Sequence, residues 1–292
     1  MGFFKVKLNG RADHKVYVAV FTCFETRAVH AEIIFKLDAD SAINAITRFN
    51  ARRPGMNHLY SDRGTNFVAA NSILTRELEE INKAAVPSLA KKNITWKFNP
   101  PHAPHRGGTW ERVVGLFKKT LSGISKGDVL HYDTFATAVT EAEGILNRRP
   151  LTHISTDSRD MEALTPNHLL CPSTVHLRDQ PEIRSSSDAA NDARNSWTRA
   201  QARVNSFWRE FRRDYLSLLH SRAKWRKSTD NLKINDLVII VDNSTERNQW
   251  KMGRIVGTDC SDGHVRKVEL VRPDGKVIQR DRAKIVKMEL DE

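Results

Sequence analysis

Two short sequence frames each place a carboxylate in a setting suited to metal-dependent chemistry. They are Ser61-Asp62-Arg63-Gly64-Thr65-Asn66-Phe67 and Gly107-Gly108-Thr109-Trp110-Glu111-Arg112. Asp62 follows an apolar run, so we expect it at the carboxyl end of a strand, where open α/β sheets place ligands. Glu111 is expected near the start of a helix. Magnesium binds through one or two protein carboxylates and keeps substrate phosphate oxygens as ligands, so the pair predicts chemistry on a polynucleotide.

Each of the two acids also has a purely structural interpretation. Asp62 could cap a turn before Gly64, because aspartate side chains accept hydrogen bonds from the backbone of tight turns. Glu111 could be a first-turn acid that the helix dipole stabilises. The residue types alone therefore leave both roles open for each acid.

Composition favours a polyanionic partner. The chain has 292 residues, with 47 Lys and Arg against 35 Asp and Glu, a formal net charge of +12. Because neutralising phosphates releases counterions, nucleic acid is the first candidate and an anionic membrane surface the second. No uninterrupted apolar span of membrane length is present, so we expect a soluble, intracellular protein, nuclear or cytoplasmic, with no membrane partner. The three cysteines are too far apart for a Cys-x-x-Cys zinc pair.

The elements that must position the two acids follow from periodicity and turn signals. Alternation predicts a three-strand antiparallel meander over residues 3–8, 15–24 and 27–35. Helical spacing then predicts a helix that Asp38 or Asp40 caps and that ends near Arg53-Pro54. The remaining expected elements of this part are a helix over 67–82, a strand over 94–98, helices over 110–122 and 132–147, and a short helical turn over 164–170.

The carboxyl-terminal part is expected to differ in kind. We predict domains at 1–175, 176–228 and 229–292: an α/β core, a linker with a basic helix over about 192–227, and a small five-strand barrel of SH3 type. Trp208 and Phe211 of this helix are expected to serve packing or self-association, and Trp250 the core of the barrel. Four arginines of the helix could follow a phosphate backbone, namely Arg203, Arg209, Arg212 and Arg213.

The order of these elements resembles the ribonuclease H-like fold, and seven frames make the resemblance closer. Residues from about 3 to 170 resemble the integrase core of Bel/Pao-type LTR retrotransposons, a class of transposable element. The frames beyond the two above are Phe21-Thr22-Cys23 with Thr26-Arg27-Ala28-Val29-His30, Trp96-Lys97-Phe98-Asn99-Pro100-Pro101, Asn147-Arg148-Arg149-Pro150-Leu151-Thr152 and Leu164-Thr165-Pro166-Asn167-His168-Leu169-Leu170. The expected carboxyl-terminal barrel looks like the one that these integrases place after the core.

The resemblance implies a DNA-joining activity. Integrases of this family hold two Mg²⁺ or Mn²⁺ ions with an Asp, Asp, Glu triad, which processes the 3′ ends of element DNA and transfers them to target DNA. The second Asp maps to Asp62 and the Glu to Glu111. The first Asp would fall just before Met1, so we expect a truncated copy or polyprotein fragment in which strand transfer is absent or severely weakened. Whether this chain is an enzyme therefore stays open.

The same resemblance implies partners and contact residues. DNA, as element ends and as target, is the expected partner, with self-association into multimers and no small-molecule substrate. Lys118 and Lys119 are candidates for holding the DNA end, with Arg106 and Arg112 beside them. A solvated helix face is the alternative for these four residues.

Two other functions remain in competition. The chain could be a non-enzymatic DNA- or chromatin-binding protein derived from a retrotransposon, which uses the basic helix and the barrel. It could also be a ribonuclease that acts on RNA–DNA hybrids, although the flanking frames resemble integrases more closely. The first alternative predicts binding without joining, and the second predicts cleavage without joining.

Overall fold

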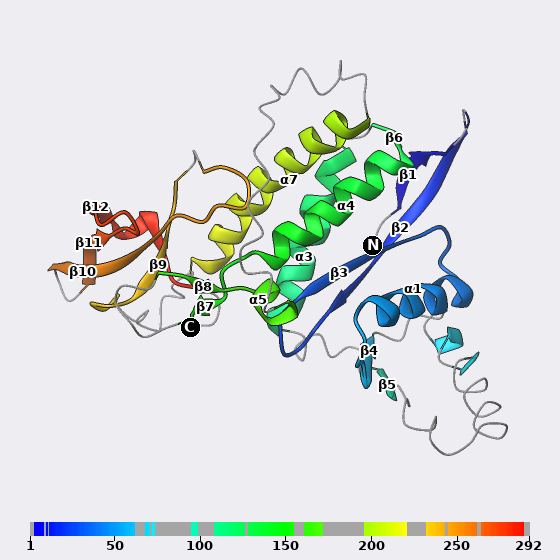
Figure 1. Cartoon of the computed structure of the whole chain (residues 1–292), viewed down its shortest axis with the longest axis horizontal. Coiled ribbons are helices and arrows are strands. Elements are labelled where there is room, and N and C mark those ends of the chain that lie inside the picture. The colour runs from blue at the N-terminus through cyan, green and yellow to red at the C-terminus, as the bar shows by residue number, and fades with distance from the viewer. Residues whose placement is uncertain are drawn as a thin grey trace. The chain divides into compact units, whose positions relative to one another are not determined.

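The structure is a computed structural model that describes residues 3–8, 10, 12–61, 68–70, 72–73, 95–98, 108–125, 128–154, 161–171, 196–220, 232–242, 245–261 and 264–288. For residues 95–98 and 108–112 it describes the backbone alone. The contacts of the chain define two compact units, shown together in Figure 1. Unit 1 comprises Met1–Thr22, His30–Val114 and Ser125–Ala136, and unit 2 comprises Cys23–Val29, Gly115–Ile124 and Thr137–Glu292. The predicted domain boundaries at 175 and 228 lie outside the described residues.

Unit 1 contains a mixed four-stranded sheet. Its strands are β1 (Phe4–Lys7), β2 (Asp13–Thr22), β3 (Val29–Ile34) and β6 (Leu130–His131), in the order β3-β2-β1-β6. β1 runs antiparallel to β2 and parallel to β6. Because successive strand residues face opposite sides, the buried Phe4 and Val6 alternate with exposed lysines. The predicted three-strand meander and the mixed α/β class are confirmed.

Helices pack on both faces of this sheet. α1 (Ala39–Arg52) begins at its N-cap Asp38, whose carboxylate accepts the Ser41 N–H at 2.9 Å, as predicted. Phe49 of α1 stacks on Phe21 of β2 with ring centroids 4.5 Å apart. On the opposite face, Phe135 of α4 (Tyr132–Asn147) lies 5.1 Å from Phe4.

The strands nearest the predicted metal site form a separate pair. β4 (His58–Ser61) and β5 (Thr95–Phe98) run parallel, with Ser61 opposite Phe98. Both strands were predicted. Of the helix expected over 67–82, residues 68–70, 72 and 73 are helical, and the remainder lies outside the described residues.

The helices of unit 2 bury a continuous aromatic row. Phe207, Phe211 and Tyr215 of α7 (Ser196–Leu219) stack in succession, with centroids 5.8 and 5.5 Å apart. Phe117 of α3 (Gly108–Ser125) meets Phe207 edge to face at 5.9 Å. The expectation that Trp208 and Phe211 serve packing is confirmed, because both are buried. α7 ends at Leu219 rather than near 227, since no further apolar residue extends the stripe that it buries.

Short elements connect these helices. β7 (Thr152–His153) pairs antiparallel with β8 (Ala163–Leu164), and α5 (Pro166–Leu170) follows. The helical turn predicted over 164–170 is therefore confirmed. Among the described residues, no helix is long and apolar enough to span a membrane.

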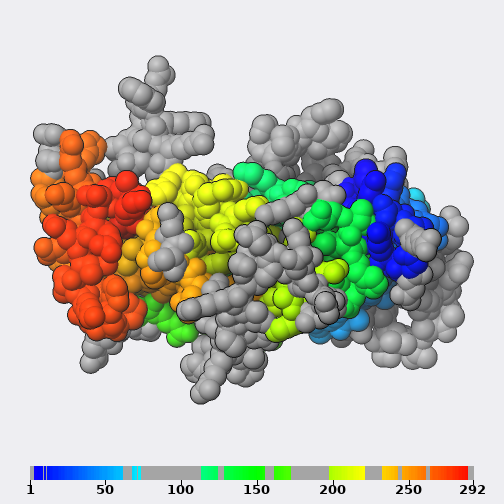
Figure 2. All heavy atoms as spheres, turned by 90° about the horizontal axis from the view of Figure 1, so that it is seen from above, coloured from blue at the N-terminus to red at the C-terminus, as the bar shows by residue number. Residues whose placement is uncertain are grey.

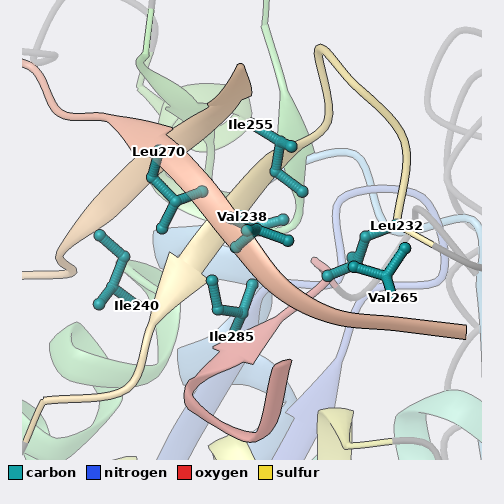
Figure 3. Close-up of a cluster of buried hydrophobic side chains, with 8 residues drawn as sticks. Leu232, Val238, Ile240, Ile255, Val265, Leu270 and Ile285 are labelled. Atoms are coloured by element: carbon teal, nitrogen blue, oxygen red, sulfur yellow. The ribbon is translucent and has the colours of Figure 1, made fainter. Parts of the chain in front are cut away.

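The carboxyl-terminal part of unit 2 is an antiparallel five-stranded sheet, in the order β12-β11-β10-β9-β13. The strands are β9 (Leu237–Ile240), β10 (Met252–Ser261), β11 (His264–Val271), β12 (Val277–Asp281) and β13 (Ile285–Val286), with the 3-10 helix η3 (Arg282–Lys284) before the last strand. Apolar side chains from four strands and from Leu232 form its core (Figure 3). The five strands confirm the predicted all-β segment, and the SH3-like form remains a prediction.

Candidate metal site and nucleic-acid interface

β4 leads directly into the first acidic frame. The strand ends at Ser61, and its parallel partner β5 ends beside it at Phe98. Asp62 is the next residue after the carboxyl end of a parallel strand, the position at which open α/β sheets place ligands. Asp62 itself lies outside the described residues.

The second acidic frame forms the start of α3. This helix begins at Gly108, so Glu111 falls in its first turn, where the helix dipole favours a negative charge. The structure describes only the helical backbone of Glu111 and Arg112, and Arg106 lies outside the described residues. The helix start was predicted at residue 110, and the observed start lies two residues earlier.

Lys118 and Lys119 are both exposed on α3, but their surroundings differ. Lys119 Nζ lies 2.8 Å from Asp214 Oδ2 of α7. Burial alone would raise the pKa of Asp214, but hydrogen bonds from Lys119 and Arg213 lower it below its ordinary value. Lys119 therefore links two helices, whereas Lys118 points away from this ion pair and reaches solvent.

The arginines of α7 divide into exposed and buried groups. Arg209 and Arg213 are exposed, and Figure 2 shows atoms of α7, in yellow, at the surface. Arg212 is buried, and its guanidinium donates to the Thr245 carbonyl at 3.3 Å. Burial lowers the pKa of Arg212, and the charge of Asp242 partly offsets this. A phosphate contact requires an accessible guanidinium, so the structure favours Arg209 and Arg213 and gives Arg212 a packing role.

A buried arginine that the sequence analysis did not single out joins the loop before β10 to two helices. Arg247 Nη1 lies 2.8 Å from Gln201 Oε1 and 3.3 Å from both Asn205 Oδ1 and Glu141 Oε2. Gln201 also donates to Glu141. These four residues, which we call the Arg247 cluster, come from α4, α7 and the loop over 241–251, so only the folded chain brings them together.

Trp250 corrects one expectation. It was predicted in the core of the barrel, but its indole contacts the rings of Trp208 and Tyr215 edge to face, with centroids 5.1 and 5.6 Å away. The position of Trp250, between the strands β9 and β10, lets it pack on α7 instead. The loop around Arg247 and Trp250 is thus a contact region for α7.

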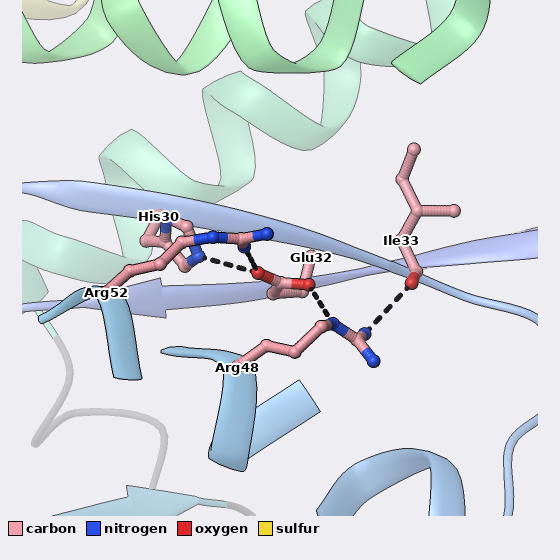
Figure 4. Close-up of polar contacts among 5 residues, drawn as sticks. All are labelled: His30, Glu32, Ile33, Arg48 and Arg52. Atoms are coloured by element: carbon pink, nitrogen blue, oxygen red, sulfur yellow. Dashed lines mark hydrogen bonds and ion pairs between the residues drawn. The ribbon is translucent and has the colours of Figure 1, made fainter. Parts of the chain in front are cut away.

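A buried carboxylate in unit 1 was also missed. Glu32 of β3 is 5% exposed and accepts hydrogen bonds from Arg48 Nε at 2.6 Å and from Arg52, while His30 Nε2 lies 3.0 Å away (Figure 4). Burial alone would raise the pKa of Glu32, but hydrogen bonds from Arg48 and His30 and the charges of both arginines lower it. We call Glu32, His30, Arg48 and Arg52 the Glu32 cluster. The available signal was an acid inside the apolar strand Val29–Ile34.

Two of the motif frames prove to be structural. Asn147 is buried, accepts the Val29 N–H and donates to the Val29 carbonyl, both at 2.8 Å. The buried Arg149 donates to the Leu146 and Arg27 carbonyls, each at 3.0 Å. The frame that begins at Asn147 therefore holds the turn between β2 and β3, where Arg27 adopts a φ of 57°.

The frame around His168 forms a helix cap. Thr165 is the N-cap of α5, with its hydroxyl 2.8 Å from His168 Nδ1, and His168 Nε2 lies 3.2 Å from Glu162 Oε1. The Thr165 N–H also donates to His168 Nδ1 at 3.0 Å, which completes a capping box. This geometry starts a helix and gives no sign of a nucleophile prepared for catalysis.

The described part of the chain holds no group of three or more His, Cys, Asp or Glu side chains that could bind a metal ion. The described carboxylates of the Glu32 cluster and of Asp214 are both occupied by cations of the chain. The predicted metal ligands belong to the two frames whose side chains lie outside the described set.

Comparison with known proteins gives partial matches. Residues 195–288 match the model of a family of unknown function, DUF5641, which covers α7 and the five-stranded sheet. No curated protein matches the chain. A chain in a cryoEM structure of the simian T-cell lymphotropic virus intasome in complex with PP2A regulatory subunit B56 gamma is 14% identical, with a TM-score of 0.38, over 98% of this chain and 76% of that chain. The crystal structure of the catalytic core domain of BIV integrase is 23% identical, with a TM-score of 0.36, over 59% of this chain and 92% of that chain.

Proposed function

We propose that this chain is a DNA-binding protein of integrase type, from a retrotransposon of Bel/Pao type, built for metal-dependent 3′-end processing and strand transfer. One structural observation supports this most. β4 ends immediately before Asp62 in a parallel strand pair, and α3 places Glu111 in its first turn. The two acids thus occupy a strand end and a helix start, as the resemblance requires.

The donor chemistry of the two acids suits Mg²⁺ or Mn²⁺. Carboxylate oxygens are the ligands that these hard cations take, and one or two protein carboxylates suffice when phosphate oxygens and water complete the shell. Asp62 and Glu111 would hold the ion, which would stabilise negative charge on the phosphodiester oxygens. In the resemblance the third carboxylate lies ahead of residue 1, so we propose that this chain is a truncated copy of the triad.

The described cations suggest where DNA is held. Arg209 and Arg213 on the exposed side of α7, and Lys118 on α3, present charge to solvent. Arg106 and Arg112 belong to the same proposal on sequence grounds. Lys119 is retained as a residue that aligns α3 with α7 through Asp214. The proposed substrates are element ends and target DNA, bound by a multimer.

A strand-transfer assay with Mg²⁺ or Mn²⁺ and element-end DNA tests the enzymatic proposal. It compares this chain with a form extended upstream to supply an Asp on the first strand. We expect joining in the extended form and its loss in Asp62→Asn and Glu111→Gln. Joining that survives both substitutions would contradict the assigned roles.

The alternative is a non-enzymatic DNA- or chromatin-binding protein. The exposed arginines of α7 favour it, because phosphate contacts by Arg209 and Arg213 need no metal ion. It predicts tight binding at low salt in both forms, unaffected by EDTA, and no joined product. Cleavage of RNA–DNA hybrids without joining would instead indicate the ribonuclease.

A further inference from the structure

One end of the β1–β2 pair has an open, cationic face. Residues with odd numbers share one side of both strands, because Lys5 pairs with Lys15 and Lys7 with Asp13 in the antiparallel register. Further along β2 the same side is covered by α1, where Phe21 stacks on Phe49. At the other end, Lys5, Lys7 and Lys15 are all exposed. We call Phe3, Lys5, Lys7 and Lys15 the lysine face.

Folding does not explain this charge pattern. Lys5 and Lys15 lie directly opposite each other, and like charges at cross-strand positions destabilise a sheet. Within the described residues no ion pair joins these lysines to an acid, although Asp13 lies opposite Lys7. The face therefore carries three positive charges, and the single acid in register with them reduces this excess only partly. An anionic partner would relieve the repulsion.

An aromatic ring lies beside these charges. Phe3 is 51% exposed, and Lys15 Nζ lies over its ring, 4.9 Å from the centroid. Lys5 and Lys7 stand two residues apart on one strand, about 7 Å. A row of cations beside an accessible ring is the combination that holds single-stranded nucleic acid, with cations on the backbone and the ring on a base. A duplex hides its base faces and could use only the charges.

We propose that the lysine face binds single-stranded nucleic acid, with Lys5, Lys7 and Lys15 on phosphates and Phe3 against a base. Figure 2 shows the β1–β2 part, in blue, reaching the surface. The proposal rests on the proposed DNA-binding function but needs neither Asp62, Glu111 nor a metal ion. It adds to the cations of α3 and α7 a contact surface on the sheet of unit 1.

Fluorescence anisotropy in EDTA tests it, with a labelled oligothymidylate and a duplex of equal length over a range of salt. The test variant is Lys5→Gln/Lys7→Gln/Lys15→Gln, and the matched control removes three exposed lysines elsewhere, Lys36→Gln/Lys276→Gln/Lys284→Gln. With three phosphate contacts, the slope of log affinity against log salt should become shallower by about 2 for the single strand. Phe3→Ala should weaken the single strand about fivefold or more, with Phe3→Leu as its packing control. Circular dichroism checks that each variant is folded.

The outcomes separate the two proposals. A greater loss on single strands than on duplex in the test variant, absent from the control variant, supports the lysine face. Equal binding by test and control variants, or an equal loss on both forms of DNA, overturns it while the proposed function stands. A wild-type chain that binds no DNA in EDTA or with Mg²⁺ overturns both.

Discussion

The Glu32 cluster of unit 1 and the Arg247 cluster of unit 2 are charge-reversed solutions to the same problem. In the first, a carboxylate is buried and two arginines reach it from solvent, with side chains 41% and 58% exposed. In the second, the guanidinium is buried at 6% exposure, and short side chains from two helices surround it. The difference lies in how much freedom the partners keep if the central group is removed.

Side-chain length decides this freedom. Arginine has a long apolar stem, so Arg48 and Arg52 can turn their charges to water when Glu32 is lost. Gln201 and Asn205 are short and fixed on α7, so their amide oxygens cannot follow solvent when Arg247 is lost. An unsatisfied buried polar group costs free energy, so the cation-centred cluster should be the more fragile.

The largest effect is expected at Arg247. Arg247→Met should lower the free energy of unfolding by about 3 kcal/mol, because it leaves Glu141 and two amide oxygens without their donor. Urea denaturation measures this. Arg280→Met, on the exposed edge strand β12, is the matched control and should change stability by less than about 0.5 kcal/mol. Equal effects of the two substitutions would remove the reason for treating Arg247 as a cluster centre.

Glu32 should follow with a smaller loss. Glu32→Ala should cost about 2 kcal/mol, since charge-assisted hydrogen bonds disappear but both arginines become hydrated. Glu32→Gln keeps an acceptor and should cost about half as much. A loss at Glu32 larger than that at Arg247→Met, in the same urea titration, would reverse the proposed order.

Acid should distinguish the clusters by sign. The pKa of Glu32 is lower in the folded chain than its ordinary value of 4.5, so its stabilisation is complete above pH 4.5 and is lost as the pH falls through the lowered value. The stability gap between wild type and Glu32→Gln should therefore close in acid. The gap between wild type and Arg247→Met reflects a guanidinium, and we expect it to persist at pH values where Glu32 has become protonated. Melting curves over a pH series compare the two gaps directly.

Single arginines of the Glu32 cluster should have the smallest effect. Arg48→Ala or Arg52→Ala should cost less than about 1 kcal/mol, because the remaining arginine still pairs with Glu32 and the exposed ion pairs are screened. A double-mutant cycle with Glu32→Gln measures the coupling. Coupling above about 2 kcal/mol for either arginine would mean that it is held as rigidly as the partners of Arg247.

Local patterns predicted the elements, but not these clusters. Helix α4 begins and ends at the predicted residues, and Asp38 caps α1 as predicted, because both signals lie within a few residues of each other. The partners of Arg247 lie 42 to 106 residues away along the chain, so no local spacing announces them. Arg212 was grouped with Arg209 and Arg213 because a sequence shows charge but not which side of a helix a neighbouring loop covers. The frames with Asp62 and Glu111 were placed correctly at a strand end and a helix start, and their metal-binding role remains a prediction.

The side chain of Asn147 also sets an order of events during synthesis. Its two hydrogen bonds to Val29 join residues separated by 118 positions. While the chain emerges from the ribosome, β2 and the turn after it are exposed long before Asn147 exists, so water must serve the Val29 backbone in the meantime. We therefore expect the turn around Arg27 to become ordered only after the end of α4 has left the exit tunnel, even though β2 and β3 are adjacent in sequence. A ribosome stalled before codon 147 would then carry a nascent chain in which this turn is still open to proteases.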